Sequence, residues 1–164
     1  MKNEIITRIK EIKIFLFDLE GVLLNDSVTT DRLFGLITAK IKEFNQLGLK
    51  FGIITAREDD DLIAKLRSIE NCVVISASLD KVSSADNYLA ESSIDYKNIF
   101  YMGDDLLDIP LLKKCRLSSA PMNGRREVKR IVNFVAKSRD PEEILNEVLN
   151  LFKKSMETEN RAAK

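Results

Sequence analysis

Acidic side chains follow two apolar segments of the sequence in an arrangement suited to metal and phosphate chemistry. Asp18 and Glu20 come directly after the run IKIFLF, and Asp104 follows the run NIFYMG, with Asp105 and Asp108 close behind it. Carboxylates that are held close together repel one another, so they need a cation between them. Mg²⁺ prefers a few carboxylate oxygens, keeps several waters and takes its other ligands from a substrate phosphate. If the two segments end side by side, this pattern predicts a magnesium site.

A hydroxyl group and two cations follow other apolar segments. Thr55 ends the run LKFGIIT and is followed by Arg57, while Lys81 comes shortly after the run NCVVIS. We expect Thr55 to donate to a phosphate oxygen and Lys81 to neutralise charge on a phosphoryl group during its transfer. We assign Arg57 to substrate binding. A carboxylate held beside Mg²⁺ and phosphate can attack phosphorus, so Asp18 is a candidate nucleophile that would form an aspartyl-phosphate.

Alternation of short apolar runs with amphipathic segments indicates how these residues are positioned. The pattern predicts strands at residues 12–18, 49–55, 71–76, 98–103, 117–121 and 133–136, and helices at 31–47, 59–69, 81–92, 106–114, 124–130 and from 141 onward. Such a series predicts an α/β, three-layer Rossmann-like fold: a mostly parallel sheet with helices on both faces and no large cap domain. Because ligands bind at the carboxyl ends of such strands, the candidate residues should converge there.

Composition excludes several classes of function. The 164-residue chain contains no His, which rules out Ser-His-Asp and Cys-His triads and His-ligated zinc. Lys plus Arg and Asp plus Glu both number 26, so net charge gives no reason to expect nucleic acid or an anionic membrane as a partner. The basic run at residues 125–130 is interpreted as a solvated helix face. Cys72 and Cys115 are interpreted as small buried hydrophobes.

Domain organisation and location follow from the same reading. We expect residues 1–153 to form a single domain and residues 154–164 to form a polar, disordered tail. The first 13 residues are too charged for the apolar region of a signal peptide, and no apolar run approaches the ~20 residues of a membrane span. We therefore expect a cytoplasmic protein that does not bind a membrane.

Four segments in order resemble the four sequence motifs of the haloacid dehalogenase superfamily. They are FLFDLEGVLL, IITAR, SLDKVSSA and YMGDDLLDIPLL; counted from the start of the predicted strand that contains the first motif, they span residues 12–112. This chain is short and has no large inserted cap, and in this it looks like the 3-deoxy-D-manno-octulosonate 8-phosphate phosphatase subgroup. The resemblance implies Mg²⁺ bound by Asp18, by the main-chain carbonyl of Glu20 and by Asp104. Asp105 and Asp108 would support the metal site and Lys81.

The resemblance also implies a function, although the sequence departs from the family pattern in three places. It implies a Mg²⁺-dependent phosphomonoester hydrolase acting on a small phosphorylated metabolite, such as a sugar-acid phosphate. Glu20 occupies the place of the general acid and base, where the family has Asp, and its side chain is one methylene longer. The β-hairpin flap of the subgroup is missing or minimal. The glycine- and arginine-rich segment near its C-terminus is absent, and the corresponding residues here read AKSRDPEEIL.

Alternative functions come from these departures and from other magnesium proteins. One is a catalytically weak or inactive binding or scaffold module that descends from such an enzyme. A signalling receiver domain is disfavoured, because its phosphorylated Asp would follow the third strand, where this chain has Ser76. The sequence leaves a homo-oligomeric state open, and it does not name the substrate.

Overall fold

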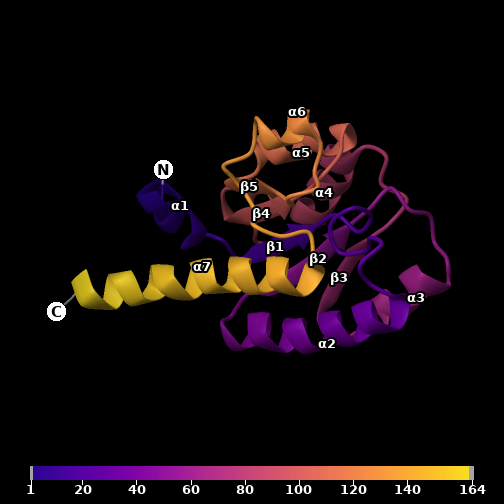
Figure 1. Cartoon of the computed structure of the whole chain (residues 1–164), viewed down its shortest axis with the longest axis horizontal. Helices are drawn as coiled ribbons and strands as arrows, with labels where there is room; N and C mark the ends of the chain where they lie inside the picture. Colours follow the sequence, from indigo (N-terminus) through magenta and orange to yellow (C-terminus); the bar gives the residue numbers. More distant parts are fainter. Residues whose placement is uncertain (1, 163–164) are drawn as a thin grey trace.

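Six parallel strands form one open sheet with helices on both faces (Figure 1). The computed structural model describes residues 2–162. The strands are β1 (Ile14–Phe17), β2 (Lys50–Ile54), β3 (Cys72–Ile75), β4 (Ile99–Met102), β5 (Leu117–Ala120) and β6 (Phe134–Val135). The helices are α1 (Lys2–Ile9), α2 (Thr30–Gln46), α3 (Asp61–Arg67), α4 (Lys81–Ala90), α5 (Ile109–Lys114), α6 (Arg126–Lys129) and α7 (Pro141–Ala162), with 3₁₀ turns η1 (Tyr96–Asn98) and η2 (Leu106–Asp108).

The strand order places the two acidic segments next to each other. The order is β3-β2-β1-β4-β5-β6, so the chain winds outward from β1 to one side and from β4 to the other. Such a reversal between neighbouring strands is the usual ligand site of an open α/β sheet. The register pairs Phe17 with Met102, and the Asp18 backbone N–H donates to the Met102 carbonyl at 2.9 Å. Asp18 and Gly103 therefore leave the sheet side by side, and the predicted fold class is confirmed.

Both faces of the sheet are buried, which explains why the residues of its central strand β1 are all apolar. Phe15 and Phe17 point into a core shared with α2, α3 and α7, whereas Ile14 and Leu16 point into a second core shared with α4, α5 and α6. Side chains alternate between faces along a strand, so a strand covered on both sides favours apolar residues at successive positions. Figure 1 shows α2 and α7 on one side of the sheet and α4, α5 and α6 on the other.

The last helix extends further than the sequence pattern suggested. We expected the folded domain to end at residue 153, but α7 continues to Ala162. Ser155 is fully buried, and its hydroxyl donates to the Phe152 carbonyl at 2.6 Å. α7 packs against α1, and composition alone does not reveal that contact. The predicted helix at 106–114 begins instead with the 3₁₀ turn η2, and the one at 124–130 is shortened to α6.

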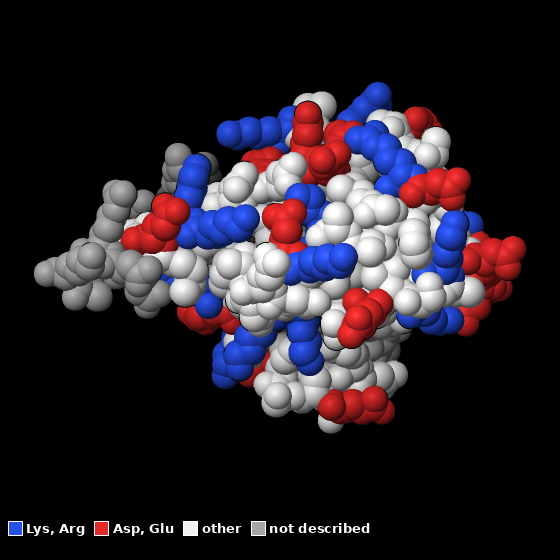
Figure 2. Space-filling view, turned by 90° about the horizontal axis from the view of Figure 1, so that it is seen from below, with Lys and Arg blue, Asp and Glu red and all other residues white. Residues whose placement is uncertain are grey.

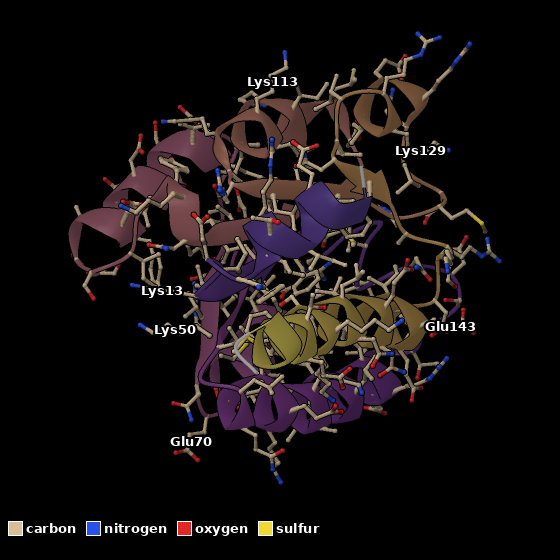
Figure 3. All side chains as sticks on the ribbon, turned by 90° about the vertical axis from the view of Figure 1, so that its left-hand side faces the viewer. Lys13, Lys50, Glu70, Lys113, Lys129 and Glu143 are labelled. Atoms are coloured by element: carbon tan, nitrogen blue, oxygen red, sulfur yellow. The ribbon has the colours of Figure 1, made fainter. Side chains whose placement is uncertain are left out.

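Charged side chains of both signs cover the surface. Figure 2 shows Lys and Arg interspersed with Asp and Glu over the face seen from below, which carries α2. Lys13 and Lys50 extend side by side near the amino ends of β1 and β2, at the edge opposite Asp18 (Figure 3). Within residues 2–162, no helix is both long and apolar enough to cross a membrane.

Candidate active site

Three carboxylates converge at the carboxyl ends of β1 and β4. Asp18, Asp104 and Asp108 each offer an oxygen atom, and these oxygens lie within 4.8 Å of one another. Asp18 is 7% exposed and Asp108 is fully buried. Three acids in so small a volume repel strongly unless cations compensate their charge.

Lys81 supplies one compensating charge at the bottom of this cluster. Its ammonium nitrogen lies 2.9 Å from Asp18 Oδ2 and 2.5 Å from Asp108 Oδ1. It also donates to the Tyr101 hydroxyl at 3.1 Å. The Asp80 carboxylate caps the first turn of α4 by accepting from the Val82 and Ser83 amides, which fixes where this helix, and hence Lys81, begins. Although burial alone would lower the pKa of Lys81, the two carboxylates raise it, so the side chain stays charged.

Asp108 holds the cluster together. Its Oδ2 accepts from the backbone amides of Asp104 and Asp105 at 2.9 and 3.0 Å, and its Oδ1 accepts from Lys81 and from the Tyr101 hydroxyl at 2.5 and 2.6 Å. Four donors occupy the lone pairs of a carboxylate. Although Asp108 is near enough to share a cation, this arrangement favours a supporting role, as the sequence predicted.

The remaining negative charge belongs mainly to Asp18 and Asp104. Burial, together with the charge of Asp108, raises the pKa of Asp18 to about 7, although Lys81 opposes this. Burial and the charges of Asp108 and Asp105 raise the pKa of Asp104 to about 6. The pKa values rise because the fold buries these acids and brings them together without enough positive charge. Such an oxygen-only donor set fits a hard divalent cation such as Mg²⁺.

Glu20 and Thr55 form a second hydrogen-bonded group beside the acids. The fully buried Thr55 donates its hydroxyl hydrogen to Glu20 Oε2 at 2.7 Å and accepts from the Arg57 backbone amide at 3.1 Å. The Arg57 guanidinium donates to Glu20 Oε1 at 3.1 Å and to Asp60 Oδ2 at 2.7 Å. Both Glu20 oxygens are thus engaged with the residues that we assigned to phosphate and substrate binding.

An open pocket of about 400 Å³ covers this arrangement. Its lining includes seven of the eight residues proposed from the sequence, namely Asp18, Glu20, Arg57, Lys81, Asp104, Asp105 and Asp108. The eighth, Thr55, is buried and reaches the pocket through Glu20. A larger hollow of about 580 Å³ lies between β6 and α7, but the converging acids and Lys81 belong to the smaller pocket. We place the candidate site by its chemistry.

Three residues of the site escaped the sequence analysis. Tyr101 contacts Lys81 and Asp108. Gly21 has a φ of +81°, and a Cβ atom there would lie 2.1 Å from Asp104 Oδ2. Arg125 pairs with Asp105 at the rim, with Nε 2.8 Å from Oδ1, and its amide donates to the Asp104 carbonyl at 2.9 Å. A tyrosine in an otherwise apolar buried strand was the one available signal, and it points to a polar partner.

The family model of the haloacid dehalogenase-like hydrolases matches residues 60–148, more than half of the chain. The protein belongs to this family. The match includes Lys81, Asp104 and Asp108 and begins after Asp18. Membership confirms the resemblance drawn from the four sequence motifs.

Solved structures of other family members share the fold across nearly the whole chain. The 3-deoxy-D-manno-octulosonate 8-phosphate phosphatase from Moraxella catarrhalis, in complex with magnesium, phosphate and KDO, is 21% identical, with 93% of this chain and 92% of that chain covered and a TM-score of 0.77. A probable YrbI family phosphatase from Pseudomonas syringae is 23% identical, with 98% and 96% covered and a TM-score of 0.79. The 3-deoxy-D-manno-octulosonate 8-phosphate phosphatase from Yersinia pestis is 18% identical, with 94% and 88% covered and a TM-score of 0.78.

Proposed function

We propose that this haloacid dehalogenase-like hydrolase is a phosphomonoesterase that requires Mg²⁺ and uses Asp18 as its nucleophile. The observation that carries the proposal is the meeting of Asp18 and Asp104 at the point where the strand order reverses, with Lys81 bonded to Asp18. Asp18, the Glu20 main-chain carbonyl and Asp104 would hold the metal ion. When bound, Mg²⁺ would screen the repulsion between the nucleophile and the phosphate.

The residues of the chain support a two-step displacement. A carboxylate oxygen of Asp18 attacks phosphorus, and the alcohol departs with a proton from Glu20. Water, which gives up a proton to Glu20, then cleaves the aspartyl-phosphate; this releases phosphate and restores both Asp18 and the protonated Glu20. Lys81 neutralises charge on the phosphoryl oxygens, and Thr55 donates to one of them once its hydroxyl hydrogen leaves Glu20.

The proposed substrate class comes from the structural relatives. The structural relatives from Moraxella catarrhalis and Yersinia pestis are phosphatases of an eight-carbon sugar-acid phosphate. The fold similarity therefore puts 3-deoxy-D-manno-octulosonate 8-phosphate first in a panel of phosphate esters, followed by other sugar phosphates and a generic aryl phosphate. Hydrolysis should require Mg²⁺ and should stop when EDTA is added.

A binding module without turnover is the second candidate, and the engaged Glu20 favours it. Both oxygens of this carboxylate already accept hydrogen bonds from Thr55 and Arg57. To act as a proton donor, the side chain must leave these partners and turn toward the leaving group. Magnesium binding without hydrolysis of any ester in the panel would support this second function and exclude the first.

Stability should depend on pH in a way that reports the metal site. Because folding raises the pKa of Asp18 from its ordinary 3.8 to about 7, and that of Asp104 to about 6, the folded state holds more protons than the unfolded state between these values. The stabilisation is complete below about pH 4 and is lost as pH rises toward 7, at about 1.4 kcal/mol for each unit by which the pKa of buried Asp18 is raised. The contribution per unit is smaller for Asp104, because solvent screens its more exposed carboxylate.

The measurement is the thermal midpoint of the metal-free protein in EDTA between about pH 4.5 and 7.5. We expect the midpoint to fall over this range and Mg²⁺ to restore it near neutral pH, because Mg²⁺ binds the ionised acids. Asp18→Asn should flatten the decline. A midpoint that is independent of pH in EDTA would contradict this account of the acids.

Gly21→Ala should weaken magnesium binding. The added methyl group would collide with Asp104 Oδ2 and displace this carboxylate from its place beside Asp18. Loss of a supporting contact at a metal site typically costs roughly 10–100-fold in metal affinity. We expect an effect of that size in calorimetric titration with Mg²⁺.

Gly48→Ala is the matched control for this substitution. Gly48 also has a positive φ, +72°, but its added Cβ would meet no atom within 4 Å. Both variants carry the left-handed backbone strain of about 1–2 kcal/mol, and Gly21→Ala alone carries the collision. Equal Mg²⁺ affinities in the two variants would show that the space beside Gly21 is unimportant for the metal.

A further inference from the structure

Tyr101 places a hydroxyl group deep inside the sheet. It lies in β4, whose four residues are all buried, and it packs in the core that β4 shares with α4, α5 and α6. Its side chain is fully buried. A buried hydroxyl is costly unless it is hydrogen bonded, and phenylalanine would fill the same space without that requirement. The hydroxyl therefore points to a role for its polar partners.

Those partners are two residues of the candidate active site. The Tyr101 hydroxyl donates to Asp108 Oδ1 at 2.6 Å and accepts from Lys81 Nζ at 3.1 Å. Lys81 is only 3% exposed, so bulk water does not readily replace either contact. Tyr101 pairs with Leu16 of β1, two residues before Asp18, so it lies beneath the pocket that Asp18 lines.

The Tyr101 hydroxyl occupies one of the three N–H donors of the Lys81 ammonium group. A lysine ammonium has three N–H donors, and in Lys81 they face Asp18, Asp108 and Tyr101. Asp108 and Tyr101 are fully buried, whereas Asp18 is 7% exposed at the floor of the pocket. With two donors held from below, the third is directed at Asp18 Oδ2 and at the space beside it.

We propose that Tyr101 is a positioning residue for the reaction: its hydroxyl fixes the Lys81 ammonium so that one N–H faces Asp18 and the phosphoryl group undergoing transfer. This inference rests on the proposed function. Asp108 cannot substitute for the hydroxyl, because its other oxygen is held by the Asp104 and Asp105 amides. Without the hydroxyl, one N–H of Lys81 loses its acceptor and the ammonium is free to tilt toward the two carboxylates.

Tyr101→Phe tests the proposal with a nearly isosteric change. We expect kcat to fall about tenfold, since displacing a catalytic group by a fraction of an ångström weakens contacts made in the transition state. KM for the ester should stay within about twofold, because the hydroxyl lies below the pocket and does not contact substrate. Magnesium affinity should be unchanged, since Asp104 keeps its contacts.

Tyr96→Phe is the matched control. Tyr96 also packs against α4 and donates its hydroxyl hydrogen to an aspartate, Asp86 Oδ1, at 2.7 Å. Removing that hydroxyl perturbs α4 without touching the acids of the pocket, so kcat should remain that of the wild type. The positioning role is overturned if Tyr101→Phe lowers kcat no more than Tyr96→Phe does, or if it acts through KM alone.

A second readout does not need turnover. The side-chain ammonium of Lys81 can be followed by ¹H–¹⁵N NMR, where burial and three hydrogen bonds should slow its exchange with water. Tyr101→Phe should shift this resonance and speed its exchange, and Tyr96→Phe should leave both unchanged. If the wild-type protein hydrolyses no ester of the panel, the proposed function is wrong. If the Lys81 resonance is unchanged in Tyr101→Phe, the positioning role is wrong even when the proposed function holds.

Discussion

Asp18→Asn is expected to abolish hydrolysis, with kcat reduced by ~10⁴-fold or more. Loss of a nucleophile has an effect of about this size or larger in enzymes that form covalent intermediates. The carboxamide is nearly the same size as the carboxylate, but it cannot attack phosphorus to form an acyl phosphate. Its oxygen can still accept from the Leu19 amide, as Asp18 Oδ1 does at 2.7 Å, so the loop should keep its conformation.

The measurement combines steady-state rates with trapping of the intermediate. Wild-type protein quenched in acid during turnover of a ³²P-labelled ester should carry label that hydroxylamine releases, as expected of an acyl phosphate. Asp18→Asn should carry none. Asp95→Asn is the control, since Asp95 is an exposed acid that caps η1 at the amino end of β4, opposite the pocket. Equal rates for wild type and Asp18→Asn would refute the nucleophile assignment.

The fold was predictable because its strands have unambiguous patterns. Residues 14–17 are all apolar, and 99–102 are apolar except for the Tyr101 hydroxyl, as expected of strands buried on both faces; each is followed by acids or glycine. The helix between β1 and β2 shows a regular buried stripe that includes Leu33, Ile37 and Phe44. Once the series of strands and helices is recognised, parallel topology brings the strand ends together without further information.

The proposed site residues could be predicted from their positions after the strands, but the contacts among them could not. The sequence placed Glu20 near Asp18, but it could not show that Thr55 and Arg57 occupy both of its oxygens. Likewise, Gly21 appears in the sequence as a turn residue, whereas its importance lies in the 2.1 Å that a Cβ would leave to Asp104. Such contacts depend on loop conformations and side-chain rotamers, which have no periodic signature.

The extent of the last helix could not be predicted from the sequence for a related reason. The polar composition after residue 153 favours disorder, yet α7, which packs against α1, continues to Ala162. A helix that packs against a neighbour needs only a narrow apolar stripe, and tertiary contacts then override local composition. The sequence does not reveal that α1 and α7 meet, since their residues lie at opposite ends of the chain.

Lys81→Met should have the largest effect on stability, because Lys81 compensates two buried acids at once. Its removal leaves Asp18 and fully buried Asp108 beside each other without a cation and deprives Tyr101 of a donor. Breaking a buried ion pair by removing one partner typically costs about 3–5 kcal/mol. We expect a loss of this size in denaturant unfolding in EDTA, together with a fall in kcat of at least ~100-fold from the missing charge.

Lys40→Met separates this effect from the general cost of replacing a buried lysine. The Lys40 ammonium, on α2, lies 2.6 Å from Glu43 Oε1 and 2.7 Å from Asn146 Oδ1, but the Glu43 side chain is 38% exposed, so water can solvate it when Lys40 is lost. That variant should lose about 1 kcal/mol or less and keep its activity. Mg²⁺ should also stabilise Lys81→Met more than wild type, because a cation between Asp18 and Asp104 then relieves repulsion that Lys81 no longer offsets. If both variants lose equal stability and respond equally to Mg²⁺, the acids at the ends of β1 and β4 do not form the cluster of mutually repelling carboxylates on which the proposed chemistry depends.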